Sequence, residues 1–340
     1  MKRGFGSDNH SGVHPELFKA LVDANHDHAP SYGTDEISEV AQVLFQKHFG
    51  AKAQVYYVFN GTAANALSLC AMIESYESIL VSDISHFNMD ECGAPEFFSG
   101  GKLQVIPSLH GKIQLADLEK SLIRRGDQHF SQARAVSLTQ PTEVGTVYSL
   151  QGLRDITAWA HKNNLLVHLD GARIANAARF LRVGFQQMTT DLGIDIVSFG
   201  GTKNGFLFGE AIVILNPDLA HQFKYLRKQA AQLPSKTRFI AAQFERYLGT
   251  DLWQEIADHE CKMAEKLHRA LQDHHGVQIT QPRQSNAVFV KIPQPWIKKL
   301  REHFFFYVWD EKTFECRLMT TWDTQEEDIQ SFVSLLKEFQ

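Results

Sequence analysis

Apolar residues recur along the chain with two alternating periods. Short runs of apolar, often β-branched residues, such as 54–59 and 165–170, predict buried strands. Apolar residues at helical spacing, as in 36–49, predict amphipathic helices. Further strands are expected at 79–81, 103–106, 135–138, 194–199 and 211–215. Short strands that are apolar on both faces and alternate with helices predict an α/β fold with a mainly parallel sheet covered on both sides.

The pattern changes after about residue 277. Strand-like segments at 287–292, 304–309 and 316–319, with helices near 296–303 and 325–339, indicate a small α+β domain. We therefore expect three parts, namely an N-terminal segment (1–30), a large ligand-binding domain (31–248) and a small C-terminal domain (249–340).

Composition and net charge limit the classes of protein to which the chain can belong. The chain has 340 residues, of which 44% are hydrophobic and 21% charged, and a net charge of −5 without long runs of like charge. This balance is ordinary for a soluble globular protein and argues against a nucleic-acid or membrane-surface partner. The four cysteines lie far apart, and no secretory leader or 18-residue apolar segment is evident. We therefore expect a cytoplasmic protein with free thiols.

Sixteen histidines are many for this length, but their spacing matches no metal-binding motif. Neither H-E-x-x-H nor a Cys/His ligand pattern occurs. We expect no metal site.

One lysine, Lys203, lies in a glycine-rich loop directly after a predicted strand. Strand 194–199 runs into Gly200-Gly201-Thr202-Lys203-Asn204-Gly205. Glycines at this density let the backbone approach a ligand closely. A solvated loop lysine is the plain interpretation of Lys203, and an amine that forms a Schiff base is the functional one.

Other polar residues follow the remaining strands. Gly61-Thr62 opens a helix and could bind an anion or be a simple helix cap. His86 could lie flat on an aromatic ligand or be a surface histidine. Together with Lys203, the residues expected at carboxyl ends of strands are Gly61, Thr62, His86, Gln140 and Asp170. Ligands of parallel sheets bind at that edge, so the convergence favours one site there.

Two basic features remain. Arg317 lies in an otherwise apolar strand and needs a partner, either a ligand carboxylate or a protein carboxylate. The basic stretch 223–238 could be a solvated helix end, a phosphate contact or a subunit contact.

These parts describe a site for pyridoxal 5′-phosphate (PLP). Lys203 would form the Schiff base, and Asp170 would face the pyridine nitrogen and favour the protonated, electron-withdrawing ring. His86 would stack on the ring, while Gly61 and Thr62, followed by Ala63, would hold the phosphate. Arg173 and Arg317 would clamp the carboxylate of an amino acid. The cofactor-binding residues predicted from these parts are Gly61, Thr62, Ala63, His86, Gln140, Asp170, Arg173 and Lys203.

Four motifs together resemble the low-specificity L-threonine aldolases, which belong to the β-eliminating lyase group of fold-type-I PLP enzymes. They are His168-Leu169-Asp170-Gly171-Ala172-Arg173, Ser198 to Gly205, Gly61-Thr62-Ala63-Ala64-Asn65, and Ser7-Asp8-Asn9 with Tyr32-Gly33. The first two form a specific pair, and the resemblance spans nearly the whole chain, being weakest after about residue 275.

The resemblance implies retro-aldol cleavage of L-threonine or L-allo-threonine to glycine and acetaldehyde. Lys203, His86 and Asp170 would be catalytic, and the implied substrate-binding residues are Ser7, Tyr32, Arg173 and Arg317. It also implies a homotetramer built from dimers, in which Lys228 or Arg238 reaches the phosphate of a neighbouring subunit.

The chain departs from many relatives at one segment. They carry a second histidine in an Asn-Thr-His sequence, where this chain has Gln140-Pro141-Thr142-Glu143. Glu91 and Glu143 are candidates for the proton transfer that such a histidine would perform. Rival hypotheses are a phenylserine aldolase, another β-eliminating PLP lyase, and a PLP-binding protein without turnover.

Overall fold

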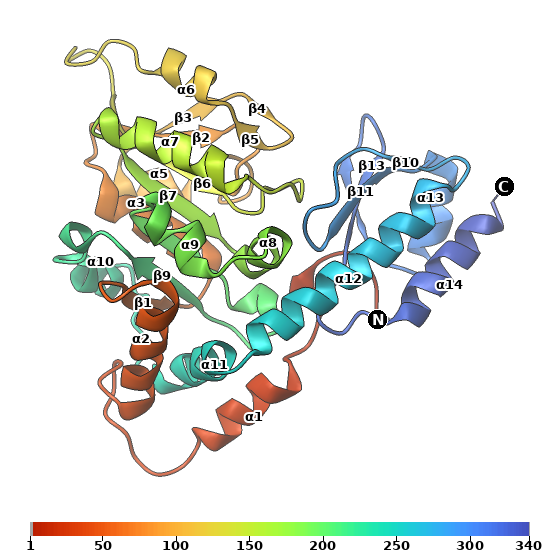
Figure 1. Ribbon diagram of the computed structural model, residues 1–340, viewed down its shortest axis with the longest axis horizontal. Coiled ribbons are helices and arrows are strands. Elements are labelled where there is room, and N and C mark those ends of the chain that lie inside the picture. The colour runs from red at the N-terminus through yellow and green to blue at the C-terminus, as the bar shows by residue number, and fades with distance from the viewer. Residues whose placement is uncertain (1–2, 340) are drawn as a thin grey trace.

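The computed structural model describes residues 3–339, so residues 1, 2 and 340 of the expected terminal segments lie outside the described residues. A seven-stranded sheet forms the larger part of the molecule (Figure 1). Its strands, in spatial order, are β1 (Gln54–Val58), β9 (Glu210–Ile214), β8 (Ile196–Phe199), β7 (Leu166–Gly171), β6 (Gln132–Thr139), β2 (Glu77–Ser82) and β3 (Lys102–Ile106).

The sheet is mainly parallel, as predicted. Only β9 runs antiparallel, and it pairs in that direction with both β1 and β8. The connection from β8 to β9 is too short for a helical crossover, which accounts for the reversal. A small hairpin of β4 (Ser108–Leu109) and β5 (Lys112–Ile113) follows β3.

Helices cover both faces of this sheet. One face packs on α2 (Glu36–Phe49), α7 (Leu150–Lys162), α8 (Ile174–Leu181), α9 (Phe185–Met188) and α11 (Arg238–Gly249). The other face packs on α3 (Gly61–Met72) and α10 (Phe223–Gln229). The shorter helices around the edges are α1 (Pro15–Asp23), α4 (His86–Met89), α5 (Ala94–Ser99) and α6 (Leu115–Ser121).

A second, antiparallel sheet lies beside the first. Its order is β10 (Gln278–Ile279), β11 (Ala287–Lys291), β13 (Glu315–Met319) and β12 (Tyr307–Asp310), with α13 (Gln294–Arg301) and α14 (Glu326–Lys337) beside it. The long helix α12 (Leu252–Gln272) runs from the large sheet to the small one (Figure 1). The boundaries proposed from the sequence, after residues 30 and 248, remain a prediction.

The N-terminal segment joins the two sheets. Phe5 is fully buried in the core of the small sheet, and its backbone pairs with Phe305 and Met319. The next residues, Ser7 and Asp8, are buried as well. Packing of Phe5 therefore fixes where the polar residues after it lie.

Candidate active site

The carboxyl ends of β7 and β8 open onto a cavity of about 280 Å³. Asp170 lies at the end of β7, and Lys203 lies in the short turn of helix that follows β8. The predicted residues that line this cavity are Gly61, Thr62, His86, Asp170 and Lys203. The structure thus brings five predicted side chains and turns from four strand ends to one place.

Two glycines let the Lys203 loop approach its neighbours. A Cβ atom on Gly200 would lie 2.1 Å from the carbonyl oxygen of Ala172, and one on Gly201 would lie 2.3 Å from that of Gly209. Both distances are far shorter than non-bonded contacts allow, so only glycine fits. The loop is therefore held tightly against the turn after β7.

The Lys203 amine lies in surroundings that favour its neutral form. Burial lowers the pKa of Lys203, and the positive charge of Arg173 lowers it further, while Asp8 and Asp170 act in the opposite direction. A lower pKa increases the share of unprotonated amine, which is the form that attacks a carbonyl carbon.

A chain of hydrogen bonds links Asp170 to His86. Asn65 Nδ2 donates to Asp170 Oδ2 at 3.0 Å and to Glu91 Oε1 at 2.7 Å. The same Glu91 oxygen lies 2.7 Å from His86 Nδ1. This hydrogen bond raises the pKa of His86. This series of hydrogen bonds fixes both the Asp170 carboxylate and the His86 ring at the cavity wall.

The N-terminus of α3 closes the far end of the cavity. Asn60 caps the helix, and its Oδ1 accepts the N–H of Ala63 at 2.9 Å. The first N–H groups of a helix have no intrahelical acceptor and attract anions. Gly61 and Thr62 provide these groups, and a Cβ atom on Gly61 would meet no atom within 4 Å.

A second cavity of about 480 Å³ adjoins the first, and both are lined by Asn9, His86 and Lys203. Three predicted substrate contacts, Ser7, Arg173 and Arg317, line it. Its other lining residues include Met89, Asp90, Glu143, Tyr307 and Trp309. This cavity lies between the large sheet and the small one, since Arg317 belongs to β13.

Arg317 has room for an anion. Its Nη2 donates to the carbonyl oxygen of Gly6 at 3.2 Å, and its Nε is buried without a partner among the described residues. Its guanidinium carbon lies 4.9 Å from the Trp309 ring centre. Burial lowers the pKa of Arg317 to about 10, with a further contribution from Arg173. A ligand carboxylate would satisfy the Nε–H and relieve the repulsion.

Arg173 already has a protein partner. Its Nε and Nη2 donate to the two carboxylate oxygens of Asp8 at 2.5 and 2.9 Å. Burial alone would raise the pKa of Asp8, but Arg173, together with Lys203 and Arg317, outweighs this effect and the pKa is lowered. The bidentate pair orients the guanidinium at the wall of the second cavity.

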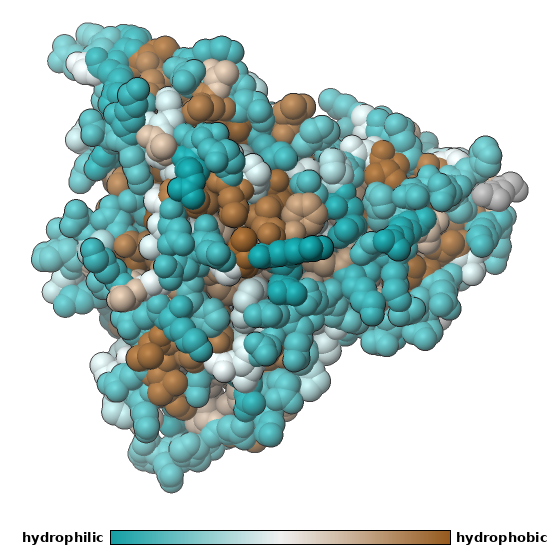
Figure 2. All heavy atoms as spheres, viewed as in Figure 1, coloured by the Kyte–Doolittle hydropathy of each residue, from teal (hydrophilic) through white to brown (hydrophobic). Residues whose placement is uncertain are grey.

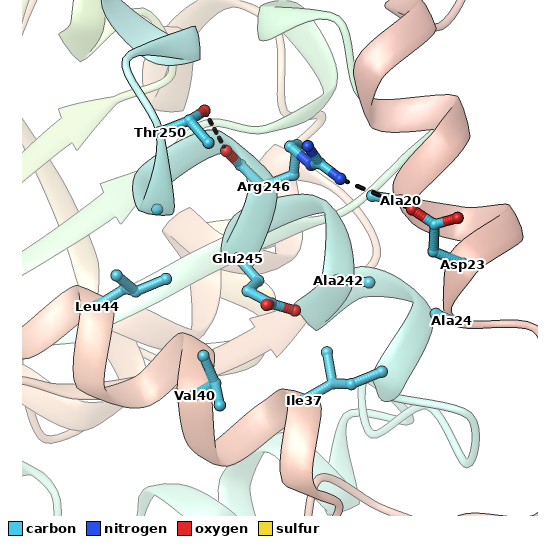
Figure 3. Close-up of a pocket in the computed structure, with 11 residues that line it drawn as sticks. Ala20, Asp23, Ala24, Ile37, Val40, Leu44, Ala242, Glu245, Arg246 and Thr250 are labelled. Carbon is cyan, nitrogen blue, oxygen red and sulfur yellow. Dashed lines mark hydrogen bonds and ion pairs between the residues drawn. The ribbon is translucent and has the colours of Figure 1, made fainter.

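Figure 3 shows a different cavity, of about 530 Å³, between α1, α2 and α11. Apolar side chains, among them Ile37 and Val40, line it together with an ion pair between Arg246 and Asp23, whose atoms lie 3.6 Å apart. None of the predicted site residues lines it. The residues predicted to carry the chemistry therefore gather at the two cavities at Lys203 and not at this one.

Comparison with known proteins shows the family to which the chain belongs. The sequence model for beta-eliminating lyases matches residues 4–294. The chain belongs to the beta-eliminating lyase family. Low specificity L-threonine aldolases from Pseudomonas aeruginosa and another Pseudomonas are 41% and 39% identical to it, covering 96% and 97% of this chain and 94% and 96% of theirs. A threonine aldolase structure from Leishmania major superposes with a TM-score of 0.93 at 30% identity, covering 99% of each chain.

Membership in this family confirms three predictions made from the sequence. They are the fold-type-I α/β architecture, the assignment as a PLP-dependent lyase, and the resemblance to the low-specificity L-threonine aldolases.

The residues of this beta-eliminating lyase fit PLP. The first cavity offers an amine with a lowered pKa at Lys203, a fixed carboxylate at Asp170 and helix N–H groups at Gly61 and Thr62. These groups suit the aldehyde, the ring nitrogen and the phosphate of the cofactor, respectively. His86 lines the same cavity and is held by Glu91, so its ring is available to stack.

Two predicted cofactor contacts lie elsewhere. The amide of Gln140 is fully buried and bonds with the backbone of Tyr148, as both donor and acceptor, at 3.0 and 2.9 Å. It shapes the loop after β6 and does not line the cavity. Ala63 gives its N–H to Asn60 and is likewise absent from the cavity wall.

Three further predicted residues lie outside both cavities of this chain. Lys228 Nζ lies 5.4 Å from the ring centre of Tyr32, whose side chain is exposed. Arg238 donates to the carbonyl oxygens of His26 and Asp27. Within one chain these residues contact neither Lys203 nor Arg317.

Four site residues were missed in the sequence. Asn9 lines both cavities, Asp8 holds Arg173, Asn65 bridges two carboxylates, and Glu210 accepts the N–H of Gly201 at 2.5 Å. Asp8, Asn9 and Asn65 stand inside motifs that carry the family resemblance, which was the available signal. Glu210 opens β9 and had no such signal.

Over residues 3–339, no helix is both long and apolar enough to cross a membrane. No group of three or more His, Cys, Asp or Glu side chains in that part of the chain is arranged to hold a metal ion.

Proposed function

We propose that this protein catalyses the PLP-dependent retro-aldol cleavage of L-threonine or L-allo-threonine to glycine and acetaldehyde. The observation that carries the proposal is that Lys203 and Arg317 face the same cavity. Lys203 offers an amine with a lowered pKa, and Arg317 offers a buried guanidinium Nε that has no partner within residues 3–339. The relatives that support this substrate class are themselves low specificity L-threonine aldolases.

The chain would hold the cofactor in the first cavity, through Lys203 at its aldehyde, Asp170 at its ring nitrogen and the start of α3 at its phosphate. When bound, PLP withdraws electrons from the Cα atom of an amino acid. The negative charge of Asp170 would favour the protonated ring nitrogen. Asn65 and the N–H of Ala172, at 3.0 Å each, fix the Asp170 carboxylate.

The second cavity would orient the substrate. Arg317, with Ser7 and Arg173 beside it, would bind the substrate carboxylate and bring its amino group toward Lys203. This orientation decides which bond to Cα stands perpendicular to the cofactor ring, and so which bond breaks. These contacts lie between the two sheets, where the Arg317 guanidinium also packs over the rings of Tyr307 and Trp309.

A second substrate class is favoured by the wall of this cavity. Met89, Tyr307 and Trp309 are large and line the side away from the cofactor cavity. A phenyl group on Cβ would find apolar and aromatic contacts there. Phenylserine is therefore the alternative β-hydroxy amino acid, and the residues that bind the cofactor would be the same.

The test is aldehyde release from purified protein supplied with PLP. L-threonine, L-allo-threonine, D-threonine and L-phenylserine are offered separately, and acetaldehyde or benzaldehyde is measured along with glycine. We expect aldehyde release from an L-isomer and none from D-threonine, because binding of the substrate carboxylate by Arg317 selects the L configuration at Cα. Release from D-threonine, or aldehyde without glycine, contradicts the proposal.

We also propose that the working form is a homotetramer built from dimers. Two apolar groups on the surface support two kinds of contact between copies of the chain. One lies on α1 and α2, with Phe18, Val22, Val40 and Val43 exposed, and Figure 2 shows apolar atoms gathered over the region of α2. The other lies near the active site, with Met89, Phe97 and Phe98 exposed. In the dimer, Lys228 or Arg238 would reach the phosphate of the neighbouring subunit.

A cytoplasmic location is likewise part of the proposal. Cys70, Cys92, Cys261 and Cys316 are all free thiols. Free thiols in an enzyme of this size are typical of a reducing compartment.

A further inference from the structure

One carboxyl group at the second cavity has no part in the function described so far. Glu143 lies in the loop between β6 and α7, and it lines the cavity together with Lys203, Arg173 and Arg317. The other carboxyl and imidazole side chains on this wall are those of Asp90 and His86.

The two oxygens of Glu143 differ. Oε1 accepts the backbone N–H of His86 at 2.8 Å and the hydroxyl of Thr139 at 3.0 Å. Oε2 is enclosed and has no hydrogen-bond partner among the described residues. Oε1 therefore anchors the side chain, while the hydrogen-bonding capacity of Oε2 is not used by the described residues.

Its surroundings place the carboxyl between its charged and neutral forms near neutral pH. Burial raises the pKa of Glu143 to about 7, and the negative charge of Asp170 contributes to the rise. The hydrogen bonds from His86 and Thr139 act in the opposite direction. A general base works best when its pKa lies close to the working pH.

The other two candidates are less suited to receive a proton from a substrate. His86 Nδ1 is occupied by Glu91, and the ring lies at the wall shared with the cofactor cavity. Asp90 is exposed to solvent. The substrate amino group would point to Lys203 and its carboxylate to Arg317. We infer that the Cβ substituent, with its hydroxyl group, then points to the wall that carries Glu143.

We propose that Glu143 is the catalytic base that accepts the proton of the substrate β-hydroxyl group. As the O–H bond breaks, its electron pair forms the carbonyl bond of the aldehyde, and the electrons of the Cα–Cβ bond remain with Cα. The reaction is balanced because Cα then takes up one proton, which gives glycine, and Glu143 releases the proton that it accepted. This inference rests on the proposed retro-aldol function.

Three measurements on Glu143→Gln test it. The first is aldehyde release from L-threonine and L-phenylserine, for which we expect kcat to fall about 100-fold or more, the usual contribution of a positioned base. The second is exchange of the Cα proton of glycine with deuterated water. Glycine has no β-hydroxyl group, so this exchange should stay within a few-fold of the wild-type rate.

The third measurement needs no cofactor. Infrared titration of the PLP-free protein should show a carboxyl group that titrates near pH 7, and this signal should be missing from Glu143→Gln. The titratable and charged groups that line the same cavity as Glu143 are His86, Asp90, Arg173, Lys203, Tyr307 and Arg317. Besides burial, the negative charge of Asp170 is what raises the pKa of Glu143. Glu245→Gln is the matched control, because burial also raises the pKa of Glu245 but the residue lines the distant cavity of Figure 3.

The outcomes separate the possible roles. Loss of cleavage with glycine exchange retained and the titration removed supports the proposal. Equal loss of both reactions means that Glu143 only positions His86, and unchanged cleavage means that another group accepts the proton; either result overturns it. If the wild-type protein cleaves neither substrate while it exchanges glycine, the proposed function has failed, and the base assignment fails with it.

Discussion

At the scale of single residues, the site combines charges that are satisfied within the protein with charges that are left for a ligand. Arg173 is neutralised by Asp8, whereas Arg317 has a buried Nε–H without a partner among the described residues. Lys203 lines the same cavity, and its pKa is lowered first by burial and then by Arg173. An anionic ligand on Arg317 would therefore stabilise the site by removing a buried, unpaired charge.

Arg317 is the first residue on which a prediction depends. Replacing it with Lys keeps the charge but loses the planar fork, so we expect kcat/KM for L-threonine to fall about 10- to 100-fold, mostly through a higher KM. Steady-state kinetics measure this. Arg301→Lys, on the surface helix α13, is the control. An unchanged KM in Arg317→Lys would mean that the substrate carboxylate binds elsewhere.

The pKa of His86 gives a second prediction. Glu91 raises it through a hydrogen bond, so Glu91→Gln should lower it. With its pKa raised in the folded state, His86 adds stability that is present at low pH and is lost as pH rises through the folded pKa. Glu91→Gln should remove this contribution. NMR titration of the His86 ring checks the shift, with His48 as reference, and an unmoved His86 titration argues against the hydrogen bond.

Sequence reasoning identified the residue types of the site better than their orientations. Lys203, Asp170, His86, Arg173, Arg317 and Ser7 all reach the two cavities. Gln140 does not, because its amide satisfies the Tyr148 backbone inside the loop. The direction of a loop side chain depends on such local partners, which periodicity does not reveal.

At the scale of elements, the strands and helices follow the hydrophobic pattern closely. Helix α2 has the predicted bounds, and β8 begins only two residues after the expected start of its strand. The antiparallel direction of β9 was not predicted, since direction depends on how the connection crosses the sheet. The position of Glu210 beside the Lys203 loop follows from that direction.

The turn after β8 gives a prediction at this scale. Gly200→Ala would force a Cβ atom against the Ala172 carbonyl, so we expect the free energy of unfolding to fall by about 2 kcal/mol or more. Chemical denaturation measures it. Gly12→Ala is matched, because a Cβ atom there meets nothing within 4 Å and the change should be within about 0.5 kcal/mol. Equal stabilities of the two variants would contradict the close approach.

At the scale of the whole molecule, the active site is assembled from distant parts of the chain. The large sheet supplies Lys203 and Asp170, the small sheet supplies Arg317, and the N-terminal segment supplies Ser7 and Asp8. Phe5 is packed in the core of the small sheet, so folding of that sheet positions Asp8 against Arg173. Substrate orientation thus depends on the arrangement of both sheets, whereas the cofactor-binding groups lie on the large one.

The central claim is that Lys203 is the amine that binds PLP and that cleavage depends on it. Borohydride reduction of the wild-type protein loaded with PLP, followed by peptide mass analysis, tests this most directly. We expect the reduced cofactor on Lys203, and we expect Lys203→Ala to remain folded without the label or aldehyde release. A label on another lysine, or substantial cleavage by Lys203→Ala, would contradict the account.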